Sequence, residues 1–450
     1  MFHRLLIANR GEVAVRIARA CRSLGIAPIG VISEADRGAS WTEVMDEVVC
    51  VGPAAPSTSY LRMQRIVQAA HQTRASAVHP GWGFLAENQR FAALVRQHGF
   101  AFVGPSTRSM REMGQKSPAK RAMRAAGLDV VPGSDGPLAD ADAAVRVANE
   151  VGYPVLLKAE SGGGGRGMRR VDREADVHAA FSAAAAEAAS AFGDASVFLE
   201  KLIEHGRHIE VQVLCDHFGN GVHLGERECS VQRKHQKLLE ESPSPALSRD
   251  VATDLGERAL AAALAVGYAS AGTIEFLLTP GGEFYFLEMN TRLQVEHPVS
   301  ELVSGVDIAA EQIRIAANHR LSLTQADVRL SGHAIELRIN AEDPAEDFRP
   351  TPGQIERFDF PSDVTGATLR IDTHVRSGDT IPPYYDSLVA KLLVHAADRA
   401  AAIEALERVL DATHIEGIAT TIPLHRAVLA DPGFRAGNYD TSRLPGWERA

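Results

Sequence analysis

The segment Glu288–Glu296 places a polar side chain at every second position. Alternate side chains of an extended chain share one face. The side chains on that face would be Glu288, Asn290, Arg292, Gln294 and Glu296. Most of the residues between them are apolar, so we expect the polar row to face an internal cleft. The alternative is the solvated face of an edge strand, but such a face usually includes lysine and threonine.

A second carboxylate belongs to a neighbouring strand pattern. Glu275 falls within Gly272–Leu277, whose composition indicates a similar strand. Two carboxylates on adjacent strands suit Mg²⁺, a hard cation that takes oxygen ligands from proteins and from phosphates. A single glutamate in a strand more often forms an ion pair at the rim of a sheet. The pairing with Glu288 is what favours a metal site here.

A glycine run at 162–165 follows the apolar strand pattern Val155–Lys158. Backbone amides without a Cβ beside them can approach phosphate oxygens closely. The next segment, Met168–Val171, indicates a strand rather than a helix, and the sequence has no G-x-x-x-x-G-K-[ST] motif. Both facts argue against the common nucleotide-binding fingerprints. We expect a hairpin whose mobile glycine loop closes over phosphates, with Lys116 and Lys158 as candidate contacts. A flexible linker is the alternative.

Basic and polar side chains gather between residues 227 and 237 of an otherwise acidic chain. We predict a loop that contains Arg227, Gln232, Arg233, Lys234, His235 and Lys237. A solvated loop and an anion-binding loop both fit this composition. His208 stands just before the strand pattern 210–214, where a hydrogen-bonded strand histidine is the ordinary interpretation.

Strand and helix patterns alternate over the first 110 residues. Short apolar runs predict strands, and apolar residues at helical spacing predict helices. The expected strands are 5–8, 29–32, 75–78 and 101–103, and the expected helices begin at Glu12 and span 60–73. This alternation predicts a parallel, doubly wound sheet.

The rest of the chain divides into a helical linker, a compact unit and a larger α+β region. The linker covers about 107–128, and the compact unit covers about 130–203. Within that unit we expect strands at 155–158, 168–171 and 197–201, and an alanine-rich helix at 176–191. Within the larger region we expect strands at 210–214, 272–277 and 284–288.

Composition excludes several classes of protein. The chain has 450 residues, 45% hydrophobic and 23% charged, which is ordinary for a soluble globular protein of about three domains. The net charge of −10 argues against nucleic acid as the main partner. The four cysteines form no C-x-x-C pair, so neither a disulfide framework nor a zinc site is indicated. No apolar stretch reaches the roughly 18 residues of a membrane helix, so we expect no membrane partner and a reducing cytoplasm.

Taken in order, these motifs resemble those of the biotin carboxylase family, within the ATP-grasp superfamily. The matching segments are 7–12, 79–88, 113–116, 162–168, 227–237, 288–298, 338–344 and 382–387. The resemblance implies an α/β and α+β fold with three domains. A Rossmann-like N-terminal domain would cover 1–113, and a linker with the mobile glycine-loop lid would cover 114–204. The C-terminal half of the ATP-grasp unit and a C-terminal α+β domain would cover 205–450.

The resemblance implies an ATP-dependent ligase. Bicarbonate, ATP with Mg²⁺ or Mn²⁺, and biotin on a carrier protein would give N1-carboxybiotin, ADP and phosphate by way of carboxyphosphate. This would be the first half-reaction of an acyl-CoA carboxylase of the acetyl- or propionyl-CoA type, as in fatty acid biosynthesis. A different ATP-grasp ligase, which joins a carboxylate to an amine, would not need Arg338. A non-catalytic scaffold subunit should have lost metal, base or oxyanion residues.

The resemblance also assigns nucleotide and metal contacts. Expected ATP contacts are Lys116, Lys158, Gly163, Gly164, Gly165, Met168, His208, Gln232 and His235, with Glu200, Lys201 and Ile203 at the adenine hinge. Expected Mg²⁺ ligands are Glu275 and Glu288, with Asn290 beside them. The metal and the cationic side chains would neutralise charge on the transferring phosphoryl group.

Bicarbonate and biotin contacts follow from the same resemblance. Bicarbonate would be bound by Arg292, Gln294 and the amide of Val295. Glu296 would be the base that deprotonates it. Lys237 would steady carboxyphosphate, and Arg338 would stabilise the enolate-like oxygen of biotin. Trp82 would lie near the biotin pocket.

The sequence departs from the family pattern at a few positions. The glycine loop usually begins Lys-Ala-Ser and continues with five glycines, but Glu160 and Ser161 stand here in place of Ser-Gly. Trp82 replaces the usual tyrosine, and Trp41 replaces a customary histidine. We expect these changes to affect substrate fit and surface contacts more than the chemistry.

The sequence contains no Met-Lys-Met biotinylation motif and no carboxyltransferase region. The chain is then either a free-standing subunit or a fragment of a larger carboxylase, and we expect the former, with a biotin carboxyl carrier protein and a carboxyltransferase supplied in trans. The resemblance further implies a homodimer.

Overall fold

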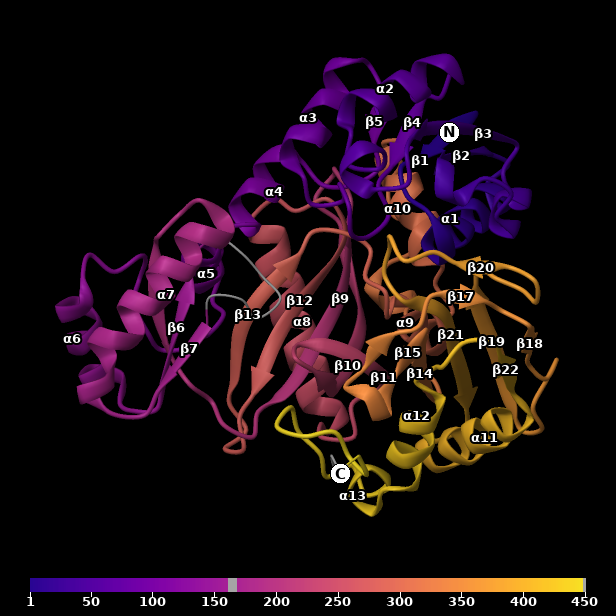
Figure 1. Ribbon diagram of the computed structural model, residues 1–450. Coiled ribbons are helices and arrows are strands. Elements are labelled where there is room, and N and C mark those ends of the chain that lie inside the picture. Colours follow the sequence, from indigo (N-terminus) through magenta and orange to yellow (C-terminus); the bar gives the residue numbers. More distant parts are fainter. Residues whose placement is uncertain (161–167, 448–450) are drawn as a thin grey trace.

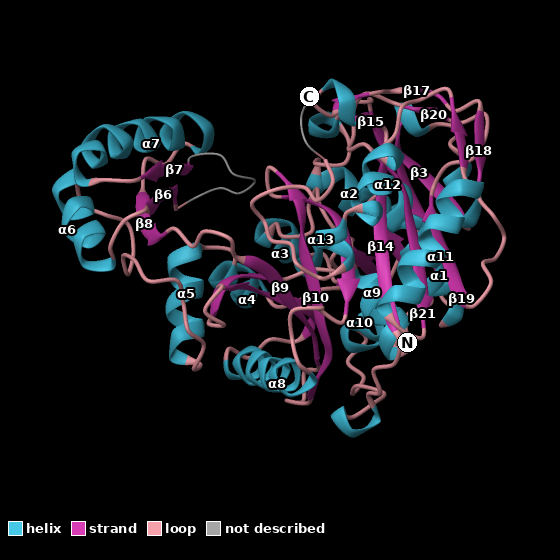
Figure 2. Ribbon diagram, turned by 90° about the horizontal axis from the view of Figure 1, so that it is seen from below, coloured by secondary structure: helices cyan, strands magenta, loops and turns pink. Residues whose placement is uncertain are grey.

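The computed structural model describes residues 1–160 and 168–447, and three main sheets organise it (Figure 1). A parallel sheet, a small antiparallel sheet and a large antiparallel sheet begin in that order along the chain. Figure 2 shows the small sheet and its helices standing to one side of the rest of the molecule. The mixed α/β and α+β fold that the sequence predicts is confirmed.

The N-terminal sheet is wholly parallel and has the strand order β3-β2-β1-β4-β5. Its strands are β1 (Arg4–Ile7), β2 (Ala27–Ser33), β3 (Glu47–Gly52), β4 (Ala77–His79) and β5 (Ala101–Phe102). Its helices are α1 (Gly11–Ser23), α2 (Met63–Gln72) and α3 (Gln89–Gln97). Leu5 and Ile7 pack with α1 on one face, and Leu6 packs with α2 and α3 on the other. Burial on both faces explains the continuous apolar pattern of β1.

The predicted helical linker is two helices, α4 (Thr107–Met113) and α5 (Lys116–Ala125). The break falls at Gly114, where an added Cβ would lie 2.6 Å from the carbonyl oxygen of Met110. Gln115 has extended backbone angles, so the chain turns before α5 begins. Lys116 is therefore the first residue of a helix.

The small sheet, which we call the lid sheet, is antiparallel with the order β7-β6-β8. Its elements are β6 (Val155–Ala159), β7 (Met168–Val171), β8 (Val197–Lys201), α6 (Ala141–Val151) and α7 (Val177–Phe192). Val155, Leu157 and Leu199 pack with alanines of α6 and α7 in a core separate from the others. This compact unit lies at the left of Figure 1.

The large sheet is antiparallel and has the order β13-β12-β9-β10-β11-β14-β21-β19. Its strands are β9 (Arg207–Cys215), β10 (Gly221–Arg233), β11 (Gln236–Ser242), β12 (Ser270–Leu278), β13 (Phe284–Asn290), β14 (His333–Asn340), β19 (Ala367–Thr373) and β21 (Leu388–Ala396). Pairing of β11 with β14, for example Leu239 opposite Leu337, makes one continuous sheet of strands far apart in sequence.

Helices cover this sheet. They are α8 (Arg249–Ala265), α9 (His297–Ser304), α10 (Ile308–Ala316), α11 (Arg399–Ala412), α12 (Ile422–Ala430) and α13 (Pro432–Arg435). Leu255 of α8 packs beneath β9 and β12, and Leu406 of α11 packs beneath β14 and β21. The short remaining strands are β15 (Glu342–Asp343), β16 (Arg349–Pro350), β17 (Gly353–Gln354), β18 (Arg357–Asp359), β20 (Thr380–Ile381) and β22 (His414–Glu416).

Two sequence predictions about local structure are wrong. The extended segment predicted over 288–296 stops at Asn290, and the chain then turns into α9. The basic loop predicted over 227–237 is a hairpin of β10 and β11, in which only Lys234 and His235 form the turn. The polar side chains of the first segment do line a cavity, as expected, but a turn and not a strand places the last of them. The second error arises because the polar side chains of the hairpin also face that cavity and not solvent.

The helices among the described residues include none that is both long enough and apolar enough to span a bilayer.

Candidate active site

A cavity of about 860 Å³ opens between the large sheet, the lid sheet and the N-terminal region. Every predicted site residue that the structure describes lines it: Trp82, Lys116, Lys158, Met168, Glu200, Lys201, Ile203, His208, Gln232, His235, Lys237, Glu275, Glu288, Asn290, Arg292, Gln294, Val295, Glu296 and Arg338. Gly163, Gly164 and Gly165 lie outside the described residues. The lining residues come from the lid sheet, from the large sheet, from α5 and from the segments between elements, including 82–87 of the N-terminal region.

Glu275 and Glu288 stand directly opposite each other on β12 and β13. Asn290 donates to Oε1 of Glu275 at 2.9 Å, and Gln294 donates to the same oxygen at 3.1 Å. Burial raises the pKa of Glu288, and the neighbouring charges of Glu275 and Glu87 raise it further. Two facing carboxylates that repel each other are the donor set that a divalent cation would stabilise.

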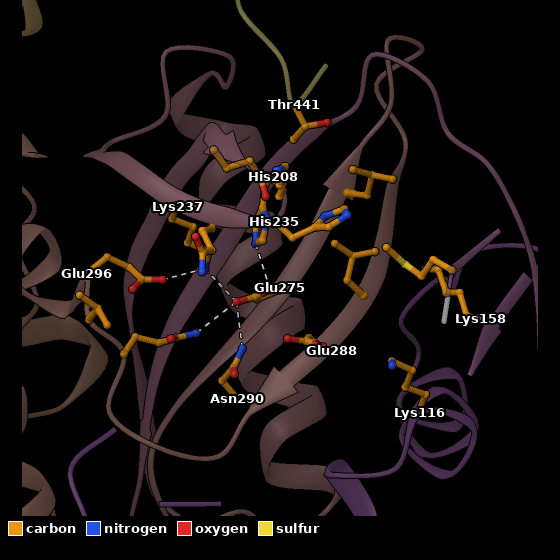
Figure 3. Close-up of a pocket in the computed structure, with 18 of the residues that line it drawn as sticks. Lys116, Lys158, His208, His235, Lys237, Glu275, Glu288, Asn290, Glu296 and Thr441 are labelled. Atoms are coloured by element: carbon orange, nitrogen blue, oxygen red, sulfur yellow. Dashed lines mark hydrogen bonds and ion pairs between the residues drawn. The ribbon is translucent and has the colours of Figure 1, made fainter. Parts of the chain in front are cut away.

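The side chain of Lys237 points between Glu296 and Glu275 (Figure 3). Its ammonium lies 2.6 Å from Glu210, 2.9 Å from Glu275 and 2.6 Å from Glu296. Burial alone would lower the pKa of Lys237, but these carboxylates outweigh burial and hold that pKa well above its ordinary value. The ammonium is thus a fixed positive charge.

Glu296 lies between two cations. Oε1 accepts from Lys237, and Oε2 accepts from Nη2 of Arg338 at 2.9 Å. Burial acts to raise the pKa of Glu296, but Lys237, Arg338 and Arg227 outweigh it, and the pKa falls well below the usual range. Arg338 is held in turn by Glu240, which accepts from its Nε at 2.6 Å.

Arg292 is fixed by neighbours on both sides. It donates to Gln294 at 2.7 Å and to Asn290 at 2.9 Å, and its Nε donates to Glu87 at 3.0 Å. Its planar guanidinium is therefore oriented within the cavity before any anion arrives. Such a group contacts a planar carboxylate-like anion through two parallel hydrogen bonds.

The histidines of the cavity have contrasting environments. Nε2 of His208 lies 3.0 Å from Glu275. Burial opposes the charge on His208, but Glu275 outweighs burial and raises the pKa. Burial lowers the pKa of His235, and the nearby positive charges of Lys158 and His208 lower it further. The pKa values of the two histidines therefore shift in opposite directions.

The lid sheet contributes a second cationic group. Lys158 of β6 pairs with Glu200 of β8, whose other oxygen lies 2.7 Å from Lys120 of α5. Burial opposes ionisation of Glu200, but Lys158 and Lys120 lower its pKa to about 2. Lys116 approaches from the first turn of α5, and Figure 3 shows it on the same side of the cavity as Lys158. Lys201 points its ammonium to the backbone carbonyls of Gly152 and Tyr153.

Sequence reasoning missed Glu210 behind Lys237 and placed its partner Arg227 in a loop. Glu210 is completely buried, and it joins Lys237 to Arg227. Arg227 also donates to Gln212 at 2.7 Å and to Thr273 at 3.1 Å. The alternation of polar His208, Glu210 and Gln212 with apolar residues along β9 was a signal that could have found them.

Lys391 and Glu12 were also missed. Lys391 of β21 has no exposed surface, and its ammonium donates to the carbonyl oxygen of Val295 at 2.9 Å. The same ammonium lies 2.9 Å from Glu12, in the first turn of α1. The segment 291–296 is thereby anchored from behind to both the large sheet and the N-terminal region.

Trp82 borders the cavity from the N-terminal region. Its backbone carbonyl accepts from Asn9 at 2.7 Å, and Asn9 also donates to Pro80 at the same distance. This pair of bonds fixes the segment that carries the tryptophan ring.

Three family descriptions match the chain in succession. They are the biotin carboxylase N-terminal domain over residues 1–110, the ATP-binding domain of carbamoyl-phosphate synthase L chain over 115–324, and the biotin carboxylase C-terminal domain over 336–445. Together they span almost all of the sequence.

Individual relatives agree along the full length. A biotin carboxylase of Nostoc sp. is 52% identical over 98% of both chains. A pyruvate carboxylase subunit of Methanothermobacter thermautotrophicus is 47% identical over 100% of this chain and 91% of its own.

A solved structure is similar throughout. It is the biotin carboxylase domain dimer of 2-oxoglutarate carboxylase from Hydrogenobacter thermophilus, in complex with MgADP, ADP and bicarbonate. It has a TM-score of 0.93 and 46% identity, and the match covers 98% of this chain and 96% of that one. The chain belongs to the biotin carboxylase family of ATP-grasp ligases.

Proposed function

We propose that the protein carboxylates N1 of carrier-bound biotin at the expense of ATP. Bicarbonate attacks the γ-phosphorus of ATP, which gives carboxyphosphate and ADP. Carboxyphosphate then yields carbon dioxide and phosphate, and N1 of biotin takes up the carbon dioxide. The observation that carries this proposal is the placement of Glu296 between Lys237 and Arg338, in a cavity that also holds two facing carboxylates and two lysines of the lid side.

The first step is activation of bicarbonate. Arg292 and Gln294 offer donors to the anion together with the backbone amide of Val295, and Glu296 accepts its proton. Glu296 has a low pKa while Lys237 and Arg338 bond to it. Bicarbonate and phosphate oxygens compete for these two cations, so substrate binding raises the pKa of Glu296 and makes it a better base.

The second step is phosphoryl transfer. Lys116 and Lys158 neutralise the phosphates, and Lys237 steadies the carboxyphosphate that forms. Glu275, Glu288 and Asn290 would hold Mg²⁺ or Mn²⁺, which supplies charge neutralisation on the transferring group. These residues fit the ion because the pKa of Glu288 is raised by burial and by the repulsion of its carboxylate neighbours.

The third step is carboxylation of biotin. The ureido N–H is a very weak acid, so its deprotonation needs a permanent positive charge at the adjacent oxygen. Arg338 provides that charge, and the phosphate released from carboxyphosphate takes the proton of N1. Trp82 borders the space that the biotin ring would occupy.

The adenine of ATP would lie at the opposite end of the cavity. We place it against the hinge residues Glu200, Lys201 and Ile203, with Met168, His208, Gln232, His235 and the glycine residues 163–165 around the ribose and phosphates. All of these residues except the glycines line the described cavity. The similar structure with MgADP and bicarbonate supports the choice of ligands.

The proposal is tested by ADP release from the purified protein with Mg²⁺, ATP and bicarbonate, with and without free biotin. We expect a rate that requires bicarbonate and rises with biotin. ATP cleavage that needs an amine in place of biotin would support a carboxylate–amine ligase. ATP binding without any turnover, also with a biotinylated carrier, would support a scaffold subunit.

We further propose that the protein serves an acyl-CoA carboxylase, with the carrier and the carboxyltransferase as separate partners. The relatives are also subunits or domains of pyruvate and 2-oxoglutarate carboxylases, so the acceptor must be tested directly. Reconstitution with candidate carrier and carboxyltransferase subunits would be assayed with acetyl-CoA, propionyl-CoA and pyruvate. Carboxylation of pyruvate alone would contradict the acyl-CoA proposal.

We propose a homodimer in the cytoplasm. The dimeric state of the similar Hydrogenobacter domain supports the first part. Free thiols at Cys21, Cys50, Cys215 and Cys229 support a reducing compartment. Sedimentation equilibrium should give about twice the chain mass of 48.3 kDa, and cell fractionation tests the location.

A further inference from the structure

Glu160 stands directly after β6, at a position where the chain departs from the family pattern. Its backbone N–H donates to the carbonyl oxygen of Ser196 at 2.9 Å, so its backbone is fixed beside the lid sheet. Its carboxylate crosses to α5. Oε1 accepts from the backbone N–H of Ser117 at 3.0 Å, and Oε2 accepts from the Ser117 hydroxyl at 2.6 Å. One carboxylate thus joins two elements through both of its oxygens.

The first turn of α5 needs this acceptor. The first N–H groups of a helix have no partner inside the helix, and a side chain at the N-cap commonly accepts from them. The N-cap of α5 is Gln115, which makes no such bond. Glu160 supplies the acceptor from another element, and its negative charge lies at the positive end of the helix dipole. Ser117 is only 5% exposed, so solvent competes little for this contact.

Both ends of the contact lie beside an expected phosphate ligand. Ser117 follows Lys116 at the start of α5, and Glu160 comes two residues after Lys158 of β6. Figure 3 shows the two lysines entering the cavity from different elements. The bonds between Glu160 and Ser117 therefore fix the backbone of one lysine relative to the backbone of the other.

A second polar contact joins α5 to the lid sheet, about one helical turn after Ser117. Lys120 of α5 bonds to Glu200 of β8 at 2.7 Å and to the carbonyl of Val131 at 3.1 Å. Residues three apart share one face of a helix, so Ser117 and Lys120 both face the lid sheet. Glu200 belongs to the expected adenine hinge, whereas Glu160 has no assigned role.

We propose that Glu160 is a positioning residue of the nucleotide site, which sets the spacing of Lys116 and Lys158 through its two bonds to Ser117. The proposal rests on the function proposed above, because it takes these lysines as ATP ligands. Two ammonium groups that converge on one polyphosphate repel each other while the nucleotide is absent. The two hydrogen bonds from Ser117 to Glu160, made at the base of both lysines, hold their backbones in place against that repulsion and keep the pair preorganised.

The test compares Glu160→Ala with Glu160→Gln. Alanine removes both bonds, and we expect the KM for ATP to rise about three- to tenfold, as loss of an N-cap and of a buried hydrogen bond suggests. The kcat and the KM for bicarbonate should change little, because Glu160 lies away from the reacting atoms. Glutamine keeps an acceptor for the N–H and a donor for the hydroxyl, so it should rescue most of the ATP affinity.

Further variants locate the effect. Ser117→Ala removes only the hydroxyl bond, so we expect a smaller rise in the KM for ATP and no further rise when it is added to Glu160→Ala. Glu150→Ala, at an exposed position of α6, is the matched control and should leave the KM unchanged. Thermal unfolding of each variant separates lost positioning from lost folding.

Three results would decide against the proposals, and they are distinguishable. An unchanged KM for ATP in Glu160→Ala would overturn the role of Glu160. An equal rise in Glu160→Gln would show that charge acts, and not hydrogen-bonded positioning. Lys158→Ala tests the underlying function. If ATP affinity were unchanged in this variant, the assignment of the nucleotide site would be wrong, independently of the result for Glu160.

Discussion

The pKa of Glu296 depends on whether its two cationic partners, Lys237 and Arg338, stay bonded to its carboxylate. Although burial opposes it, Lys237 and Arg338 keep this pKa well below the usual range in the ligand-free protein. A carboxylate with so low a pKa is a weak base. In the function proposed above, substrate anions draw these cations away and raise the pKa, so Glu296 becomes an effective base only when the site is filled. We therefore expect little ATP cleavage in the absence of bicarbonate.

Glu296→Gln should remove the base and keep the shape of the side chain. We expect bicarbonate-dependent ADP release to fall by about two to four orders of magnitude, the usual contribution of a general base. MgATP binding, measured by calorimetry, should persist. Glu257→Gln, on the exposed side of α8, is the matched control. Full activity of Glu296→Gln would refute the assignment of the base.

Arg338→Lys should separate the two halves of the reaction. Lysine keeps the charge, but it cannot contact Glu240, Glu296 and a biotin oxygen through one planar group. We expect the stimulation of ADP release by biotin to fall about 10²-fold or more, as for loss of an oxyanion donor. ADP release with bicarbonate alone should fall much less. Equal losses with and without biotin would contradict a role confined to biotin.

At the scale of elements, the segment 291–296 depends on supports outside its own strand. It follows β13 but leaves the sheet at Asn290, so ladder hydrogen bonds do not hold it. Lys391 bonds to the Val295 carbonyl from β21, and Glu12 of α1 fixes Lys391. The donors that we propose for bicarbonate are therefore held by two other regions of the chain.

Lys391→Met combined with Glu12→Gln tests this support. The double change avoids leaving Glu12 as an unpaired buried charge, which would cost about 3–5 kcal/mol of stability. We expect the KM for bicarbonate to rise about tenfold, equivalent to loss of one charged hydrogen bond, and the KM for ATP to stay unchanged. Glu12→Gln alone keeps the bond to Val295 and should have a smaller effect. Equal increases in the KM for bicarbonate and the KM for ATP would show a general loss of structure in the site, and would contradict a specific support of the segment 291–296.

Sequence patterns predicted the elements whose apolar residues face a core. Leu5 to Ile7 and the apolar face of α1 follow local periodicity, so both ends of β1 and the start of α1 were foreseen to within one residue. The family motifs also named residues that the structure brings together in one cavity, because the motifs carry them in order. In both cases the information is local in the sequence.

The hairpin of β10 and β11 could not be predicted in the same way. Its polar residues point into a cavity, and polarity in a sequence does not distinguish a cavity from solvent. Arg227 is completely buried, yet its type suggested a surface loop. Lys391 could have been predicted more easily. A lone lysine within the apolar run Leu388–Val394 is itself a sign of a buried ion pair.

At the scale of the whole molecule, Glu241 joins three distant parts of the chain. It is completely buried on β11, accepts from His333 at 2.6 Å and from Arg399 at 2.6 Å, and also bonds to Tyr439. Burial acts to raise its pKa, but the bonds from His333 and Arg399 outweigh burial and lower the pKa to about 2. The folded state therefore stabilises the charged form of Glu241.

The stability that Glu241 contributes should depend on pH. Because its pKa is lowered on folding from an ordinary 4.5, the contribution is complete above that pH and disappears as pH falls toward 2. The shift corresponds to a stabilisation on the order of 3 kcal/mol. Urea unfolding should show Glu241→Gln less stable than the parent at neutral pH, with the difference shrinking in acid. A difference independent of pH would contradict this, and Glu257→Gln is the control.

The continuous large sheet has a consequence for cutting the chain into parts. In the strand order of the large sheet, β11 is the last strand contributed by the ATP-binding segment, and it pairs with β14 of the C-terminal segment. A fragment of residues 115–324 would leave β11 as an open edge and would uncover Leu238 and Leu239, which pack against Ile335 and Leu337. Exposed apolar edges recruit further strands, so such a fragment would aggregate. Any excised catalytic unit must therefore keep both segments, although the family descriptions treat them as separate modules.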